Sequence, residues 1–316
     1  MIEYIGNGHG LKSLFNQAIN EKDLAKIHKR VLADQEIKAF LKKHKNELTD
    51  AKIKRNFAKL YEYVSQKHKF LTQAETYVAP GYEPKLIFQN HSLDVTYEPT
   101  AFLLAKQKEE AIKARIHVMN IPKDVRNASF KTITLTRDAH RVSAIKKAKN
   151  FVESFIADYA KRHQGLYLYG DFGIGKSFLM GAMANELAIK GFVTTLLHFP
   201  SFLAELRDAM NFEKNEIGSK INTVKRSEIL MLDDIGAESV TSWSRDDILL
   251  GIVQYRMQEQ LPTLFTSNRD FKGLEEHLRF DNKGNDEPMQ ARRVMERIKY
   301  LSEEVLYGGE NARNPM

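Results

Sequence analysis

A glycine-rich octapeptide limits this chain to very few folds because of where it stands. Residues 170–177 read GDFGIGKS and fit the pattern G-x-x-x-x-G-K-[ST]. The strand-like run GLYLY (165–169) precedes it, and a helix-like stretch follows from Gly175 to Lys190. In this context, backbone N–H groups and a helix N-terminus bind phosphate groups. The pattern predicts a nucleotide-binding α/β fold.

All eight residues of this phosphate loop are candidates for contact with ATP. They are Gly170, Asp171, Phe172, Gly173, Ile174, Gly175, Lys176 and Ser177. We expect Lys176 to reach the β- and γ-phosphates and Ser177 to bind Mg²⁺.

Two acidic residues follow a second apolar run, ILML (229–232), and complete the expected site. Asp233 is expected to hold Mg²⁺ through water, and Asp234 to orient or activate the attacking water. Most hydrolytic P-loop proteins of this type have glutamate at the second position, so the shorter Asp234 predicts slow hydrolysis. Asn268, at the end of the run TLFTS (263–267), is expected to hydrogen-bond the γ-phosphate or the water.

The order of predicted elements divides the chain. Residues 1–118 are mainly helical, with a small β-hairpin formed by KLIFQ and LDVTY around residues 90–91. Residues 119–135 are typical of a linker, and from 136 onward strands alternate with helices, which predicts a parallel sheet. A helix after Thr100 is expected to run to about His117.

The charge and composition exclude several classes of protein. The net charge is +7, and residues 1–120 hold 20 Lys and Arg against 14 Asp and Glu. This asymmetry fits nucleic acid or an acidic partner, but also solvated helix faces, and is too modest to identify a partner. The chain has no cysteine, no apolar run of about 18 residues and no secretion signal. We expect a cytoplasmic protein without membrane attachment.

Four segments taken together resemble the AAA+ ATPases of the helicase-loader group, of the DnaI and DnaC type. They are GDFGIGKS, ILMLDDIGAE, the TSN triplet and ARRVMERIKYL. The resemblance implies a P-loop AAA+ core without a helical lid, preceded by a mainly helical domain. It implies an ATP-dependent loader of the hexameric replicative DNA helicase during primosome assembly. Residues 1–118 would dock on the helicase, 136–316 would form the ATPase domain, and Phe130 in segment 119–135 would lie near the adenine.

The same resemblance implies two further roles. Arg297 would be an arginine finger that completes a neighbouring subunit's site, so that the ATPase domain self-assembles; a salt-bridging role, or Arg292 or Arg293 as the finger, stays open. An added helical segment between 200 and 225 would contact single-stranded DNA, although an ordinary amphipathic helix is the alternative. The candidate DNA contacts are Arg207, Met210, Lys214 and Lys220, with Phe202 as a possible base-stacking residue.

The chain departs from the family pattern at one point, and rival functions remain. DnaI-type proteins usually carry a zinc module built on cysteines and a histidine, and this chain has no cysteine, so zinc is unlikely. The alternative function is that of a transposition-helper AAA+ ATPase of the same clade, whose N-terminal part is shorter. A P-loop small-molecule kinase and a nucleotide-binding scaffold without turnover are weaker rivals.

Overall fold

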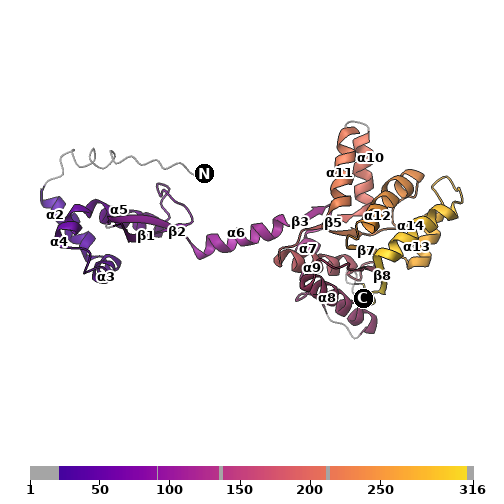
Figure 1. The fold of residues 1–316 in the computed structure, drawn as a ribbon, viewed down its shortest axis with the longest axis horizontal. Coiled ribbons are helices and arrows are strands. Elements are labelled where there is room, and N and C mark those ends of the chain that lie inside the picture. Colours follow the sequence, from indigo (N-terminus) through magenta and orange to yellow (C-terminus); the bar gives the residue numbers. More distant parts are fainter. Residues whose placement is uncertain (1–20, 91, 135–137, 211–213, 312–316) are drawn as a thin grey trace. The chain divides into compact units, whose positions relative to one another are not determined.

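The computed structural model describes residues 21–90, 92–134, 138–210 and 214–311 (Figure 1). The chain divides into two compact units, Met1–Lys108 and Glu109–Met316. The functional domain boundaries expected from the sequence stay a prediction. In the described ranges, no helix is both long and apolar enough to cross a lipid bilayer.

Four helices and a β-hairpin form the described part of the first unit. The elements are α2 (Glu21–Ala33), α3 (Gln35–Lys43), α4 (Asp50–Arg55), α5 (Phe57–Leu71), β1 (Tyr82–Gln89) and β2 (Ser92–Pro99). The two strands pair antiparallel from Tyr82 opposite Pro99 to Gln89 opposite Ser92. Apolar side chains of the helices and of the hairpin share one buried core, which includes Ile37, Leu60 and Leu93. The predicted hairpin and mainly helical character are confirmed.

The chain leaves this unit through α6 (Ala101–Ala114), in which no residue is buried. The backbone N–H of Leu103 donates to the Thr100 hydroxyl, so Thr100 begins this helix as expected. The helix ends at Ala114, however, and not near His117. Residues Ile116–Met119 form strand β3, which pairs with β5 in the second unit.

The second unit is built on a six-stranded parallel sheet in the order β3-β5-β6-β7-β4-β8. The strands after β3 are β4 (Gly165–Tyr169), β5 (Thr194–His198), β6 (Ile229–Asp233), β7 (Thr263–Ser267) and β8 (Ser302–Leu306). All five strand pairs are parallel. The predicted parallel α/β core is confirmed. The edge strands β3 and β8 were not predicted, because β3 has four residues and β8 exposes two glutamates.

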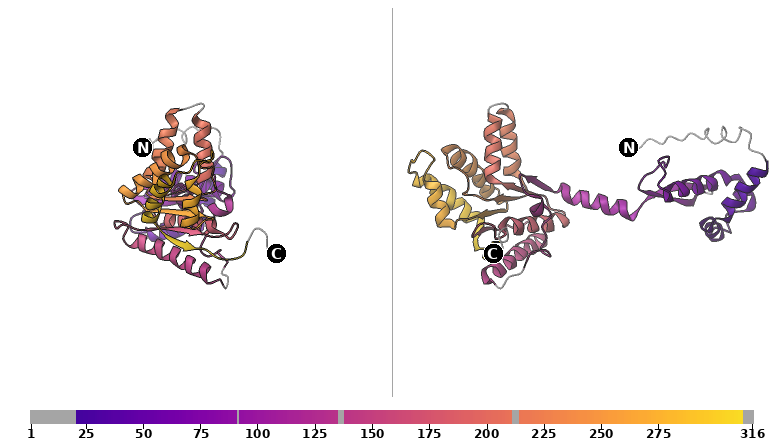
Figure 2. Two further views of the ribbon diagram at one scale, coloured as in Figure 1. Left: turned by 90° about the vertical axis from the view of Figure 1, so that its right-hand side faces the viewer. Right: turned by 180° about the vertical axis from the view of Figure 1, so that it is seen from behind.

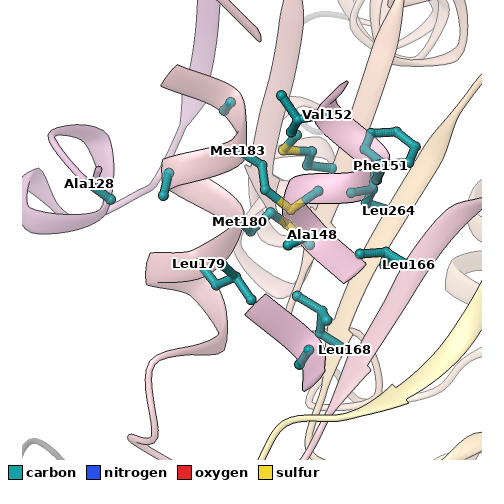
Figure 3. Close-up of a cluster of buried hydrophobic side chains, with 14 of the residues drawn as sticks. Ala128, Ala148, Phe151, Val152, Leu166, Leu168, Leu179, Met180, Met183 and Leu264 are labelled. Carbon is teal, nitrogen blue, oxygen red and sulfur yellow. The ribbon is translucent and has the colours of Figure 1, made fainter. Parts of the chain in front are cut away.

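Helices cover both faces of this sheet (Figures 1 and 2). One face carries α7 (Lys123–Arg126), α8 (Ala139–Ala157) and α9 (Lys176–Ile189). The other carries α10 (Phe199–Met210), α11 (Lys214–Arg226), α12 (Leu250–Gln258), α13 (Phe271–Arg279) and α14 (Pro288–Leu301). In Figure 3, Leu179, Met180 and Met183 lie on the side of α9 that faces Phe151 of α8 and Leu168 of β4, and all five belong to the first core. Within β6, Met231 joins the first core and Leu230 the second, as expected for a strand covered on both sides.

A π-helix, η1 (Trp243–Leu249), leads directly into α12, where the sequence predicts one helix over 244–260. The fully buried Arg245 side chain in η1 pairs with Asp246 and with Glu287, which precedes α14. Trp243 is partly buried against the second core. This segment therefore connects the chain beyond the acidic strand β6 to the beginning of α14.

Candidate nucleotide-binding site

The phosphate loop connects β4 to α9 at the carboxyl edge of the sheet. Gly170, Gly173 and Gly175 have φ values of 150°, 74° and 99°, in the range that favours glycine. A Cβ atom at Gly170 would overlap the Tyr307 carbonyl. Gly175 caps α9, whose first residue is Lys176, so the free N–H groups of the first turn lie beside the loop. This geometry is that of an anion-binding helix N-terminus.

The Lys176 ammonium lies inside the loop rather than in solvent. Its side chain is 7% exposed. Nζ donates to the carbonyls of Gly170 and Asp171 at 2.8 and 2.7 Å, and to Oδ1 of Asn268 at 2.7 Å. A positive charge is thereby fixed beside the free N–H groups at the start of α9.

Asp233, the last residue of β6, is a buried carboxylate that is 4% exposed. Oδ1 accepts hydrogen bonds from Ser177 Oγ at 2.8 Å and from Thr266 Oγ1 at 2.5 Å. Burial raises the pKa of Asp233 because it disfavours the charged form. Ser177 and Asp233 thus present oxygen donors side by side, and oxygen donors are the ligands that Mg²⁺ takes in proteins.

Asp234 follows in a left-handed conformation, with φ 62°. Its backbone N–H donates to Thr266 Oγ1 at 2.8 Å, and its Oδ1 accepts from Asn268 Nδ2 at 3.1 Å. The Asn268 amide therefore bridges Lys176 and Asp234. Five of the residues predicted from the sequence, Lys176, Ser177, Asp233, Asp234 and Asn268, lie in this one corner of the molecule.

Two residues of this corner were not predicted. Nε2 of His198, the last residue of β5, lies 3.6 Å from Oδ2 of Asp234, and this contact raises the pKa of His198. Nδ1 of the same ring lies 2.7 Å from Ser201 Oγ in α10. Thr266 of β7 contacts both acidic residues. Each is at or near the carboxyl end of a parallel strand, the one sequence signal that points to it.

Other predicted residues take different positions. The Phe172 side chain is 72% exposed, and Ile174 is buried in the first core. Phe130 packs against that core, with Lys149 Nζ 5.8 Å from its ring centroid. Contact of Phe130 with adenine stays a prediction.

Arg297 lies on α14, half-buried. Nε donates to Gln254 Oε1 of α12 at 2.7 Å, and Nη1 donates to the Arg293 carbonyl one turn earlier in α14 at 2.8 Å. Arg292 and Arg293 are exposed. The helix therefore presents three arginines, and Arg297 is held by a neighbouring helix.

Helices α10 and α11 project side by side from the sheet and form the helical insert (Figures 1 and 2). Arg207 is exposed and Lys220 is half-buried. The side chains of Met210 and Lys214 lie outside the described residues. Phe202 is 1% exposed in the second core, so its possible role in base stacking is wrong.

In the described ranges, no three His, Asp or Glu side chains gather in an arrangement that would hold a metal ion. The expectation about zinc stays a prediction.

Comparison with protein-family models gives two matches. Residues 5–97 match the model "Primosomal protein DnaI N-terminus", and residues 84–314 match "IstB-like ATP binding protein". Over 98% of its length, the chain is 35% identical to the replicative helicase loader DnaI of Bacillus subtilis strain 168, and the match covers 99% of that protein.

Two solved structures are similar in sequence and fold to about two thirds of the chain. A putative primosome component from Streptococcus pyogenes serotype M3 is 42% identical, with a TM-score of 0.53, over 66% of this chain and all of that one. A crystal structure of DnaI is 38% identical, also with a TM-score of 0.53, over 63% of this chain and 98% of that one.

Proposed function

The chain belongs to the DnaI group of replicative helicase loaders, which are AAA+ ATP-binding proteins, and from this membership we propose how its residues carry out loading. The protein binds ATP in the phosphate loop and loads the hexameric replicative helicase onto single-stranded DNA during primosome assembly. The observation that carries this proposal is the hydrogen-bonded series from Lys176 through Asn268 to Asp234.

ATP binding follows from the loop. The N–H groups at the start of α9 and the Lys176 ammonium together face the space in which phosphates bind. The β- and γ-phosphates would replace part of the shell of carbonyl oxygens that Lys176 now contacts. Because Asn268 contacts both Lys176 and Asp234, a phosphate that draws Lys176 toward itself would also change the hydrogen bonds of Asn268 and Asp234.

Mg²⁺ would be held by Ser177 Oγ and, through water, by Asp233. The buried Asp233 carboxylate accepts hydrogen bonds from two hydroxyl groups. Its pKa is nevertheless raised, because burial removes the water that would stabilise its negative charge. A divalent cation, when bound, neutralises charge on the β- and γ-phosphates. The residues at hand fit such an ion.

Hydrolysis is assigned to Asp234 and Asn268. In the proposed step, the attacking water bonds to the γ-phosphorus and gives a proton to Asp234, while the bond between the γ-phosphorus and the bridging oxygen breaks and ADP leaves with that oxygen. Asn268 orients the water or the γ-phosphate. The two Asp234 oxygens already face Asn268 and His198, and its side chain is one methylene shorter than glutamate. We therefore expect slow turnover in isolation.

Loading uses both parts of the chain. Residues 1–118 dock on the helicase, while the ATPase domain binds single-stranded DNA and self-assembles through Arg297. The γ-phosphate maintains one assembly state, and its loss releases the partner. The IstB-like match over residues 84–314 keeps a transposition-helper ATPase as the second candidate, and the primosomal match over residues 5–97 favours the loader.

The test mixes the full-length protein with the replicative helicase of its host and measures the mass of the eluting species by light scattering, with and without ATP. We expect a complex with the parent protein. Lys176→Ala should bind ATP roughly 100-fold more weakly, because charge-assisted hydrogen bonds worth about 2–3 kcal/mol are lost. Lys161→Ala is the matched control, because it replaces an exposed lysine that precedes β4, near the amino ends of the strands and away from the phosphate loop.

Two results would overturn parts of this proposal. If the parent protein binds ATP but never co-elutes with the helicase, the transposition-helper function becomes the better explanation. If Lys176→Ala binds ATP as tightly as Lys161→Ala does, the nucleotide is not held by this loop.

A further inference from the structure

The residues that follow β8 lie against the phosphate loop. The backbone N–H of Tyr307 donates to the carbonyl of Tyr169, the last residue of β4, at 2.7 Å. The Tyr307 carbonyl occupies the space that a Cβ atom at Gly170 would need. We call residues Tyr307–Asn311 the C-terminal strap. Its first residue thus meets the loop where the loop begins.

The middle of the strap is a glycine pair packed on the beginning of α8. A Cβ atom at Gly308 would overlap the Asp138 carboxylate. At Gly309, φ is 124°, and a Cβ atom would lie 3.0 Å from Arg141 Nη1. Asp138 caps α8 by accepting from the Arg141 N–H at 2.7 Å. The Asp138 cap of α8 and the Arg141 side chain therefore lie directly beneath the pair, and a Cβ atom at either glycine would crowd them.

The far end of the strap lies on the phosphate loop itself. Gly173, in the middle of the loop, has φ 74°, and a Cβ atom there would overlap the Asn311 side-chain amide. The strap therefore touches the loop at two glycines, Gly170 and Gly173. A bound triphosphate must share this loop with the strap.

Arg141 connects the strap, the loop and the segment before α8. It is a buried side chain whose Nη1 donates to the Ile174 carbonyl at 2.7 Å and whose Nε donates to the Thr134 carbonyl at 3.1 Å. Its guanidinium carbon lies 4.8 Å from the centroid of the Tyr307 ring. A guanidinium has donors in a fixed plane, so it can donate to one carbonyl of the loop and one of the segment before α8 while it stacks on a ring.

We propose that the C-terminal strap is a wall of the nucleotide site, positioned by Arg141, and that it controls how fast bound nucleotide leaves. This inference rests on the nucleotide site proposed above. Tyr307 is anchored in the first core, whereas residues 308–311 are half-buried or exposed, so this outer part of the strap can lift without unfolding the sheet. While it is seated, the nucleotide is enclosed between the loop and the strap. Lifting it opens the route to solvent.

Gly308→Ala is the sharpest variant because Gly308 has no left-handed φ, and the nearest atoms that an added Cβ atom would meet all belong to the Asp138 side chain. The experiment loads the full-length protein with the fluorescent nucleotide MANT-ADP and follows its release after mixing with excess ADP in a stopped-flow instrument. We expect Gly308→Ala to release the nucleotide about tenfold faster than the parent, which corresponds to about 1.4 kcal/mol. Asn311→Ala, which removes the amide from Gly173, should also accelerate release.

Gly251→Ala is the matched control. Gly251 lies in α12, and an added Cβ atom would meet only the mobile end of Lys225, at 3.4 Å. Release at the parental rate from both strap variants overturns the inference, and so does an equal acceleration in Gly251→Ala. Asn311→Ala decides the question if Gly308→Ala fails to fold. If the parent protein binds no MANT-ADP, the proposed nucleotide site is wrong, and the proposed role of the strap is wrong with it.

Discussion

Arg256 is fully buried where α12 meets the beginnings of β6 and β7, and it ties the helical insert to the sheet. Nη1 donates to the carbonyls of Lys225, at the end of α11, and of Ser227. Nη2 donates to the Pro262 carbonyl, and Nε to Thr263 Oγ1. Burial lowers the pKa of Arg256 to about 9 because it disfavours the charged form. One side chain therefore donates to three backbone carbonyls, of which Pro262 also accepts from the Leu230 N–H at 3.2 Å.

We expect Arg256→Met to leave the carbonyls of Lys225 and Ser227 without this donor, while Pro262 keeps the Leu230 N–H, and to destabilise the contact between the insert and the sheet by about 3 kcal/mol or more. The measurement is hydrogen exchange of peptides covering β6 and β7, read as the free energy of opening. Arg292→Met, at an exposed arginine of the same unit, is the control. Equal protection of β6 and β7 in the two variants would contradict the assignment.

At the level of single residues, the sequence predicts a site residue correctly where that residue has a fixed place in a known motif. Lys176 and Asp233 belong to such motifs. His198 does not, because its place beside the acidic residues depends on the β5–β6 register, which sets it opposite Asp233. Arg141 is similar: it precedes the Ile174 carbonyl that it binds by 33 residues. Strand register and contacts between distant segments are properties of the folded chain, so these two partners could not be predicted from the sequence.

Within the parallel sheet, the strands predicted correctly are those covered on both faces. The runs in β6 and β7 are continuously buried and therefore continuously apolar. The edge strand β8 (SEEVL) has two exposed glutamates, and β3 is short and half-buried, so neither carries that signal. The phosphate loop, with flanking strand and helix, was predicted almost to the residue.

The helical insert offers a test of the proposed DNA contact. Arg207 and Lys220 lie on different helices of the insert, and their side chains reach solvent fully or in part. If each contacts a phosphate, Arg207→Ala and Lys220→Ala should each lower the slope of log affinity against log salt by about 0.7 for a single strand. Fluorescence anisotropy with a labelled oligo-dT over a salt series measures this slope. Lys190→Ala, at the end of α9, is the control, and an unchanged slope in both insert variants would remove these residues from the interface.

For the whole molecule, the open question is assembly, and Arg297 carries the prediction. Its bonds to Gln254 and to the Arg293 carbonyl fix the guanidinium on α14, so it needs little ordering when a neighbour arrives. Arg297→Ala should leave ATP affinity within about twofold of the parent. Turnover in concentrated assemblies should fall toward the dilute value, by up to roughly 10³-fold.

The readout is phosphate release as a function of protein concentration, with Arg292→Ala as the matched arginine control. Equal turnover of Arg297→Ala and the parent at high concentration argues against a finger at this position. If Arg292→Ala alone loses turnover, Arg292 is the finger.

The organisation of the chain was predictable in outline, because a helical first part and an alternating second part have different patterns. The structure of the segment that joins these two parts was not predictable. The segment expected to finish a helix and form a linker contains β3, and β3 is recognisable only by its pairing with β5. The exposed helix α6 was predicted because Thr100 supplies a start signal that is independent of burial.

The position of Trp243 gives this protein a built-in optical probe. It is the single tryptophan among 316 residues, and it opens the π-helix η1, partly buried against the second core. The indole therefore belongs to the second unit, between the acidic strand β6 and helix α12. With excitation selective for tryptophan, emission monitors melting or rearrangement of this unit alone, whereas circular dichroism sums both units. Spectroscopy on the unlabelled chain can thus separate the two transitions.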